Sequence, residues 1–385
     1  FVLVSRFPYP LEKGDKLRAF HQIKELSKKH EIVLCALSDE KVSNSSIEKL
    51  KQYCVQVEVI RLYKLKIYWN LLMQLLFGKK SLQVSYFYSA GAHKKIENLI
   101  EKVKPDYIYC QLIRVTEYVR DLKIEKTLDY MDAFARGMER RVENAPFYLK
   151  PFLKIETKRL KRYEHDVFND FNHTSIISNQ DKELIVHIKN HEIKVIPNGV
   201  DYSTFQFKEV EKKYDLIFTG NMGYPPNIDS AVYIINEIMP LLWQKFPNVN
   251  LAIVGATPDA RVKALQSSKV TVTGWVEDIS DYYAASKIFI APMQIGTGLQ
   301  NKLLEAMAMK LPCITSKLAN NALGAIHEKD ALIGETPEDY VNHIVNLLEN
   351  QELYQKLSEN GYEFVKQNYT WEGTTQLLED LMISK

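Results

Sequence analysis

Short runs of β-prone residues alternate along the whole chain with longer segments of helical periodicity. In the first 200 residues this pattern predicts strands at 1–5, 31–37, 55–60, 106–110, 126–131, 174–178 and 193–197. The pattern then restarts and predicts strands at 214–220, 249–255, 269–274, 287–292, 312–316 and 330–334. Strands that alternate with helices build parallel sheets from strand-helix-strand units. We therefore predict the α/β class, with two doubly wound, Rossmann-like domains.

The length of the chain and one polar segment indicate where these domains meet. A chain of 385 residues favours two cores, because a single core rarely grows beyond about 250–300 residues. Residues 196–214 begin with the turn sequence PNG and continue as a polar run, which is typical of a linker. We predict domains at 1–196 and 197–370, facing each other across a cleft, with the last helix (371–385) packing back on the first domain.

The charges are unevenly distributed. Residues 1–200 carry 35 lysines and arginines against 25 acidic residues, and residues 201–385 carry 15 against 23. A basic half attracts phosphorylated ligands, anionic lipid surfaces or nucleic acid, and the charge alone does not choose among them. The sequence contains no recognisable nucleic-acid-binding module, so we expect no nucleic-acid partner.

Cysteine spacing and hydropathy restrict the location of the protein. The four cysteines show neither the spacing of a zinc site nor a disulfide framework, which fits a reducing compartment. No apolar run reaches the roughly 18 residues of a bilayer-spanning helix. Residues 63–80 and 147–166 mix apolar and aromatic side chains with basic ones, a pattern found at membrane interfaces. We expect a cytoplasmic protein with peripheral contact at the inner face of the plasma membrane; the alternative is that both stripes are core.

The sequence IGTGLQNKLLEAMA follows the strand predicted at 287–292. Gly296 and Gly298 permit close approach of a ligand, and a helix that begins near Leu299 offers free N–H groups to a phosphate. Lys302 lies in the first turn, and Glu305 lies on the same face of the helix at i+3. We expect the lysine near a diphosphate and the glutamate on ribose hydroxyls. The alternative is a simple turn followed by a surface ion pair.

Several motifs in fixed order resemble a known family. The run GLQNKLLEAMAMKLPCITS, together with VIPNGVD, FTGNMGYPPN, LAIVG and VTGWVEDISDYYAAS, resembles the carboxyl half of a family 4 glycosyltransferase, whose two-Rossmann architecture is called GT-B. The resemblance is strong over residues 174–375. In the first half it rests mainly on SRFPYPLEKGDKLRAFHQIKEL.

The resemblance implies a site for a nucleotide-sugar donor. Glu305 would bind the ribose, and residues 274–276 would bracket the base. The donor contacts implied by the motifs are Gly14, Gly220, Asn221, Gly274, Val276, Gly296, Thr297, Gly298, Leu299 and Glu305. In the loop around Gly14, Lys16 and Arg18 would be the nearby cations.

The chain departs from the family pattern at two places. The family carries glutamates at both ends of an E-x7-E spacing, and here the first position is Thr297. Many members also place an arginine and a lysine in the loop that here reads GNMGYPPN. We therefore expect Lys302 to supply the positive charge that faces the leaving diphosphate; the alternative is a solvated surface lysine.

The first domain holds the other candidate catalytic residues. Many relatives are expected to use a histidine near the transferred sugar, but no histidine lies between His93 and His165. Asp132, which follows a predicted strand, and Arg114 are the replacements we expect, with Gln111 as a further candidate. Asp132 has an equally good alternative role as the N-cap of the helix that starts near Phe134.

These observations predict an enzyme that moves a hexosyl group from a nucleotide-diphosphate donor to a hydroxyl acceptor. The resemblance implies retention of configuration, no metal or other cofactor, and a glycan or lipid-linked acceptor in surface polysaccharide or glycoconjugate assembly. One alternative is a nucleotide-sugar epimerase, which needs no second substrate. A degenerate transferase that binds nucleotide-sugar as a scaffold is the other. A dehydrogenase fits poorly, because position 301 is asparagine where a GxGxxG motif requires glycine.

Overall fold

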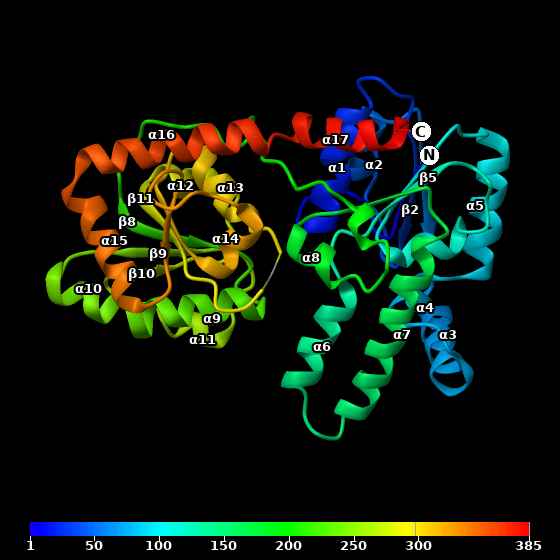
Figure 1. Cartoon of the computed structure of the whole chain (residues 1–385), viewed down its shortest axis with the longest axis horizontal. Helices are drawn as coiled ribbons and strands as arrows, with labels where there is room; N and C mark the ends of the chain where they lie inside the picture. The colour runs from blue at the N-terminus through cyan, green and yellow to red at the C-terminus, as the bar shows by residue number, and fades with distance from the viewer. Residues whose placement is uncertain (297, 385) are drawn as a thin grey trace. The chain divides into compact units, whose positions relative to one another are not determined.

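The computed structural model describes residues 1–296 and 298–384, and this part of the chain divides into two compact units (Figure 1). The first unit contains Phe1–Pro197 and the residues from Thr375 on, and the second contains Asn198–Thr374. Each unit is a layer of parallel strands with helices on both faces. The predicted α/β class with two Rossmann-like arrangements is confirmed.

The sheet of the first unit has the strand order β3-β2-β1-β4-β5-β6-β7, and all its pairs are parallel. Its strands are β1 (Val2–Val4), β2 (Val33–Ser38), β3 (Gln56–Arg61), β4 (Ile108–Gln111), β5 (Lys126–Asp129), β6 (His173–Ile176) and β7 (Lys194–Val195). Its helices are α1 (Gly14–Leu26), α2 (Asn44–Lys51), α3 (Lys64–Phe77), α4 (Leu82–Phe87), α5 (Ala90–Val103), η1 (Ile113–Tyr118), α6 (Phe134–Asn144), α7 (Lys150–Phe168), α8 (Asn179–Leu184) and η2 (Asn190–Glu192).

The sheet of the second unit repeats this arrangement in the order β10-β9-β8-β11-β12-β13, again with parallel pairs. Its strands are β8 (Tyr214–Thr219), β9 (Leu251–Val254), β10 (Val270–Val272), β11 (Ser286–Ala291), β12 (Cys313–Ser316) and β13 (Leu332–Gly334). Its helices are α9 (Pro225–Tyr233), η3 (Ile234–Ile238), α10 (Met239–Lys245), α11 (Ala260–Lys263), α12 (Ile279–Ala284), α13 (Asn301–Ala308), α14 (Lys317–Leu323), α15 (Pro337–Glu349), α16 (Gln351–Asn368) and the start of α17 (Trp371–Ile383).

Buried side chains alternate between the two faces of the first sheet, as the period of two along a strand requires. On β1, Val2 and Val4 join the core beneath α1 and α2, while Leu3 joins the core on the opposite face. Leu378 of α17 is fully buried in the same core as Val2, and Glu379 accepts hydrogen bonds from Lys29. The end of the chain is therefore an integral part of the first unit.

In both sheets the strand order reverses next to the first strand, between β1 and β4 and between β8 and β11. At such a point the loops after the two strands run to opposite faces and leave a crevice at the carboxyl ends, where open α/β sheets bind ligands. The topology therefore directs attention to the loops after β1 and β4 and to those after β8 and β11.

One helix is apolar without being part of the core. Ile67 is the buried residue of α3, whereas Leu65 is 86% and Phe77 is 77% exposed. For residues 63–80 the alternative of a core stripe is therefore wrong. In the described part of the chain, no helix combines the length and the hydropathy needed to cross a bilayer.

Candidate functional site

Two glycines let β8 and β9 end in close contact. Gly220 and Gly255 follow these strands, each with a φ of +150°. A Cβ atom on Gly255 would lie 1.7 Å from the carbonyl oxygen of Gly220, and one on Gly220 would lie 2.6 Å from Nδ2 of Asn227. Only residues without a side chain fit here, because the positions combine positive φ with direct backbone contact. The close packing brings the start of α9 to the carboxyl edge of the sheet.

The loop after β8 is fixed by Asn221. Its Oδ1 accepts hydrogen bonds from the Gly223 N–H at 2.9 Å and from Oγ1 of Thr257 at 2.7 Å. Asn227 of α9 donates to the carbonyl oxygen of Asn221 at 3.0 Å. The side chain of Asn221 remains exposed. The two predicted residues Gly220 and Asn221 therefore lie in one ordered loop at the point where the strand order reverses.

Lys302 is buried in the second unit. Its helix, α13, begins at Asn301 rather than near Leu299, because Gln300 has an extended conformation with φ −90° and ψ 96°. Lys302 is 9% exposed, donates to Oδ1 of Asn227 and lies 4.7 Å above the ring of Phe218. Burial lowers the pKa of Lys302 to about 7. The alternative of a solvated surface lysine is wrong.

Glu305 is held by a chain of hydroxyl groups. Its Oε2 accepts a hydrogen bond from the Tyr283 hydroxyl at 2.9 Å. Since Tyr283 has a single hydroxyl proton, the Thr219 hydroxyl must donate to it across their 2.7 Å contact. Burial raises the pKa of Glu305, and the charge of Lys302 opposes this rise. Within residues 1–296 and 298–384 no hydrogen bond to Oε1 occurs, so this oxygen can accept hydroxyl groups of a ligand.

The glycine-rich loop lies between β11 and α13. Gly296 has a φ of +104°, which favours glycine, and the Gly298 carbonyl accepts a hydrogen bond from Nε2 of Gln300 at 2.9 Å. Leu299 packs partly against the core of this unit. Thr297, a predicted donor contact, lies outside the described residues. The loop therefore joins the helix of Lys302 and Glu305 to the carboxyl end of β11.

The loop after β10 carries the residues predicted to bracket a base. The Gly255 N–H donates to Oγ1 of Thr273 at 3.2 Å, and this hydroxyl donates to the Gly274 carbonyl at 2.9 Å. Trp275 is 74% exposed, and Val276 packs partly against the core. An exposed indole at this edge offers a stacking surface for an aromatic ligand.

The structure thus gathers most of the predicted donor residues at one edge of the second sheet. Sequence reasoning missed four residues that organise them: Thr219, Asn227, Gly255 and Tyr283. Gly255 ends an apolar strand, as Gly220 does, and this parallel could have identified it. Asn227 and Tyr283 reach Lys302 and Glu305 from separate helices, and no local pattern marks them.

In the first unit, Asp132 lies just beyond the carboxyl end of β5, after a left-handed Met131 with φ +61°. Its side chain is exposed to solvent. The surrounding protein nevertheless desolvates the carboxyl group, and the charges of Asp181 and Asp129 add to this effect, which raises the pKa of Asp132 to about 7. A reachable carboxyl group with this pKa is suited to proton transfer near neutral pH.

The alternative role of Asp132 as a helix cap is wrong. The N-cap position of α6 is Ala133, whose side chain makes no capping hydrogen bond. Instead, the Ala135 N–H donates to Oε1 of Glu164 at 3.1 Å. Because α7 supplies the cap, Asp132 is left without this structural task.

One of the two predicted cations near Gly14 differs from expectation. Arg18 is fully buried, where its Nε donates to Oδ2 of Asp129 at 2.6 Å and the Tyr109 hydroxyl donates to the same oxygen at 2.8 Å. The expectation that Arg18 faces a ligand from this loop is therefore wrong. Gly14 is the first residue of α1, with open space around it, and Lys16 lies two residues further along this helix.

Arg114, the other predicted catalytic residue of this unit, lies in η1 after β4. Its Nε donates to Oε1 of Gln83 at 3.2 Å. It lines a cavity formed by residues of the first unit. Among the described residues, no group of three His, Cys, Asp or Glu side chains could hold a metal ion.

Comparisons with known proteins agree with this arrangement. Residues 213–350 match the family Glycosyl transferases group 1. A protein of Klebsiella pneumoniae described as an uncharacterized 44.6 kDa protein in the cps region is 24% identical over 392 residues, which cover 96% of this chain and 95% of that protein. The UDP-Gal:alpha-D-GlcNAc-diphosphoundecaprenol alpha-1,3-galactosyltransferase of Escherichia coli is 26% identical over 209 residues, 46% of this chain and 51% of that protein.

Solved structures match both units together. Alr3699/HepE of Anabaena, solved with UDP and glucose, has a TM-score of 0.69 at 14% identity, covering 100% of this chain and 99% of that chain. Sucrose-phosphate synthase of Thermosynechococcus elongatus has a TM-score of 0.70 at 13% identity, covering 99% and 97%. The chain therefore has the GT-B fold, and residues 213–350 of its second unit are similar to the Glycosyl transferases group 1 family.

Proposed function

We propose that this GT-B chain is a retaining glycosyltransferase that moves a hexosyl group from a nucleoside-diphosphate donor to a hydroxyl acceptor. The observation that carries the proposal is the arrangement on α13, within the matched domain. There Glu305 is anchored through one oxygen, and the buried Lys302 lies one turn away. This pair lies at the carboxyl edge of the second sheet, where such folds bind nucleotides.

Each part of the donor has a partner in this proposal. The ribose hydroxyls donate to Oε1 of Glu305, whose other oxygen is fixed by Tyr283. The diphosphate lies against the N–H groups at the start of α13 and near the ammonium group of Lys302, because a helix N-terminus and a cation both favour negative charge. The base stacks on the exposed ring of Trp275.

The reaction exchanges one bond at the anomeric carbon for another. The bond from this carbon to the diphosphate oxygen breaks, and the nucleoside diphosphate leaves with the electron pair. The acceptor oxygen forms its bond on the same face, and its proton passes to an oxygen of the departing phosphate. The positive charge of Lys302 and the N–H groups stabilise the negative charge that develops on the diphosphate, so the proposal requires no metal ion.

The relatives support a place in surface polysaccharide or glycoconjugate assembly. The Escherichia coli relative is named for a UDP-Gal donor and a GlcNAc-diphosphoundecaprenol acceptor, and the Klebsiella pneumoniae relative is encoded in the cps region. The structural neighbour Alr3699/HepE was solved with UDP, with UDP and glucose, and with UDP-glucose. We therefore expect a glycan or lipid-linked acceptor, and action at the inner face of the plasma membrane.

A thermal-shift screen tests the donor part of this proposal. UDP, GDP, ADP and CDP, and their common sugar conjugates, are added in the presence of EDTA. We expect one diphosphate to raise the melting temperature selectively, because a ligand that binds the folded state stabilises it by mass action. Failure of all four to shift a folded protein would contradict the proposal.

The chosen sugar conjugate then distinguishes transfer from the alternative activities. With an acceptor present, NMR of the product should show the anomeric configuration of the donor. Inverted product contradicts retention. Epimerised donor in the absence of acceptor supports an epimerase, and tight binding without any turnover supports a nucleotide-sugar-binding scaffold.

A further inference from the structure

The first unit contains a cavity that the donor site does not explain. Its volume is about 1000 Å³, and it lies at the carboxyl end of the sheet. The loops after β1 and β2 supply one side, and η1 and α6 supply another. The lining combines a basic group of side chains with an apolar wall, so the cavity favours a ligand with two chemically different parts.

The basic side chains that line the cavity are three arginines, Arg6, Arg114 and Arg141, and three lysines, Lys13, Lys16 and Lys41. Arg6 is paired with Asp15 at 2.9 Å. The described part of the chain provides no carboxylate within 4.0 Å for an ion pair with Arg114 or with Arg141. Arg114 and Arg141 therefore carry positive charge without an ion-pair partner among these residues, although the carboxylates of Glu12, Asp39, Glu40 and Glu156 also line the cavity. A bound anion beside the two arginines would neutralise this charge.

Arg114 is held in place rather than free to move into solvent. Its guanidinium group lies 5.1 Å from the ring centroid of Phe87 and 4.8 Å from that of Phe134. Burial lowers the pKa of Arg114 to about 10, and the positive charge of Arg6 contributes, while Asp15 and Asp132 oppose the shift. A fixed, planar guanidinium group in this setting matches the bidentate geometry of a phosphate.

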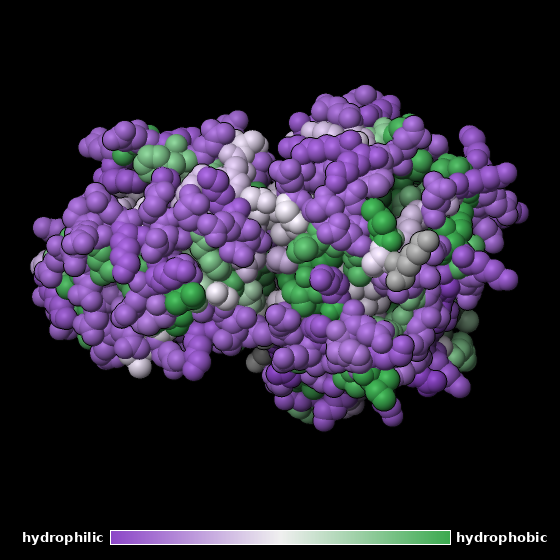
Figure 2. All heavy atoms as spheres, turned by 45° about the horizontal axis from the view of Figure 1, so that its top comes forward, coloured by the Kyte–Doolittle hydropathy of each residue, from purple (hydrophilic) through white to green (hydrophobic). Residues whose placement is uncertain are grey.

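The apolar wall of the cavity comes from α3 and α7. Leu71, Leu72 and Leu75 of α3 line it, together with Phe152 of α7. Leu72, Leu75 and Phe152 are also among the exposed large hydrophobic side chains. The wall therefore continues onto the molecular surface. Figure 2 shows one face of the molecule, on which hydrophobic side chains form patches among hydrophilic ones.

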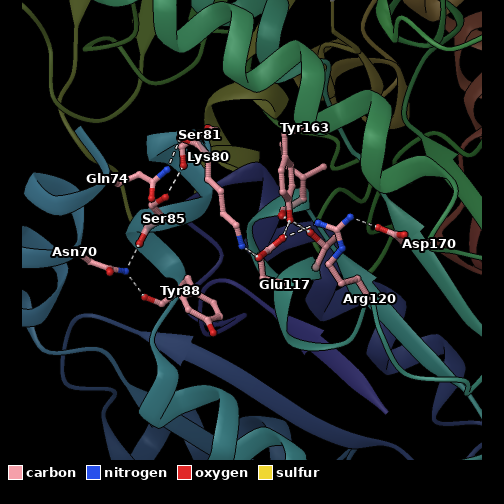
Figure 3. Close-up of polar contacts among 12 residues, drawn as sticks. Asn70, Gln74, Lys80, Ser81, Ser85, Tyr88, Glu117, Arg120, Tyr163 and Asp170 are labelled. Atoms are coloured by element: carbon pink, nitrogen blue, oxygen red, sulfur yellow. Dashed lines mark hydrogen bonds and ion pairs between the residues drawn. The ribbon is translucent and has the colours of Figure 1, made fainter. Parts of the chain in front are cut away.

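Hydrogen bonds hold α3 at this surface (Figure 3), in addition to the packing of Ile67 and Leu71 against the core. Asn70 donates from Nδ2 to the carbonyl oxygens of Ser85 at 3.1 Å and of Tyr88 at 2.9 Å. Gln74 donates to the Lys80 carbonyl at 3.1 Å, and Lys80 pairs with Glu117. The leucines of α3 are thus presented outward by specific contacts, and contiguous exposed apolar surface of this kind marks an interaction site.

We propose that this cavity binds the phosphate or diphosphate group of a lipid-linked acceptor, with the arginines on the anion and the side chains of α3 and α7 on the hydrocarbon chain. This inference rests on the proposed function and names the acceptor class. Charge complementarity favours the anion, and the apolar wall offers a contact surface that a free phosphate would leave unused. The acceptor is therefore held by its phosphate, and the sugar at its far end extends from the cavity.

Calorimetry with farnesyl diphosphate tests the inference. Inorganic diphosphate lacks the hydrocarbon chain and farnesol lacks the anion, so we expect each to bind at least about tenfold more weakly than farnesyl diphosphate. Equal affinity for inorganic and farnesyl diphosphate would show that the apolar wall takes no part. Equal affinity for farnesol and farnesyl diphosphate would remove the role of the arginines.

Five variants, two of them controls, locate the binding. We expect Arg114→Gln to weaken the binding of farnesyl diphosphate about tenfold or more, because it removes a charge-assisted contact. The same is expected of Arg141→Gln, which lies on the exposed side of the cavity. Arg162→Gln, an exposed arginine of α7 outside the cavity, is the control. Leu75→Ser should weaken binding several-fold, and Leu76→Ser, its exposed neighbour outside the cavity, should leave binding unchanged. Unchanged affinity in Arg114→Gln and Arg141→Gln overturns the inference.

Donor binding separates this inference from the proposed function. If Arg141→Gln transfers sugar to a lipid diphosphate as well as wild type does, the inference fails and the proposed function stands. If farnesyl diphosphate binds as expected but no nucleoside diphosphate binds, the proposed function fails instead.

Discussion

The two ionisable side chains of α13 have opposite shifts in pKa, and both shifts have burial as their largest cause. Lys302 is shifted down to about 7 and Glu305 is shifted up. Lys302 is therefore less charged near neutral pH than it would be in water. A ligand that brings negative charge to the lysine changes this balance, so the site should respond to pH in a defined direction.

Proton uptake should accompany donor binding through Lys302. At about pH 8 the free folded protein holds this lysine mostly neutral, and a diphosphate nearby raises its pKa. We expect calorimetry of the selected nucleoside diphosphate, in buffers of different ionisation enthalpy, to show uptake of up to about one proton at pH 8 and little at pH 6. Lys302→Met, which keeps the buried volume, should abolish the uptake; an unchanged uptake in this variant contradicts the role.

The same lysine affects stability. Its pKa is lowered in the folded state from the model-compound value of 10.5. Between about pH 7 and pH 10.5 the unfolded chain therefore holds a proton that the folded protein has released, and the contribution of Lys302 to the free energy of unfolding rises with pH over this window.

At the residue scale, the sequence predicted the members of the site but not their supports. The i+3 spacing placed Lys302 and Glu305 on one face of a helix, and the glycines marked the loop before it. Asn227 and Tyr283 come from α9 and α12, and their contacts with α13 depend on packing between distant segments. Arg18 was predicted as a cation near a ligand but is buried against Asp129 on β5. The sequence could not show this contact, because the two residues are 111 positions apart.

Among the elements, α3 is the one whose position the sequence could not decide. Its apolar stripe has the same periodicity as a core helix. In the structure Ile67 packs in the core, and Asn70 donates to two backbone carbonyl oxygens beyond the helix. The strands were simpler to predict, since short runs of β-prone residues between helical segments marked them. Helix α13 begins at Asn301, two residues later than predicted, because Gln300 is in an extended conformation and belongs to the loop.

Asn70→Ala should loosen α3 selectively. The change removes two hydrogen bonds from the buried side of the helix, which costs on the order of 1–3 kcal/mol locally. We expect hydrogen exchange of the α3 amides to accelerate, while exchange in β8 and β11 stays as in wild type. Leu76→Ala, an exposed position of the same helix, is the matched control. Equal protection of α3 in wild type and Asn70→Ala would show that other contacts hold the helix.

At the scale of the whole molecule, the two units repeat one strand order and differ in charge. The alternation of strands and helices predicted both sheets, but the order of the strands within each sheet required the structure. The excess of basic residues in the first 200 positions was visible in the sequence. Some of these basic residues are the arginines that line the first-unit cavity. The predicted donor residues on α13 and in the loop after β8 lie in the second unit.

The central claim is that the carboxyl edge of the second sheet binds a nucleotide donor through Glu305. The most direct test compares the affinity of the selected nucleoside diphosphate with that of its 2′,3′-dideoxy analogue, for wild type, Glu305→Gln and the exposed control Glu352→Gln. Hydrogen bonds to a charged group contribute about 1.5–3 kcal/mol. Wild type and Glu352→Gln should therefore bind the analogue about tenfold or more weakly than the nucleoside diphosphate. Glu305→Gln should bind both ligands with similar, reduced affinity and melt within a few degrees of wild type. The claim would be contradicted if Glu305→Gln preferred the nucleoside diphosphate over the analogue as strongly as wild type does, or if wild type bound both ligands equally well.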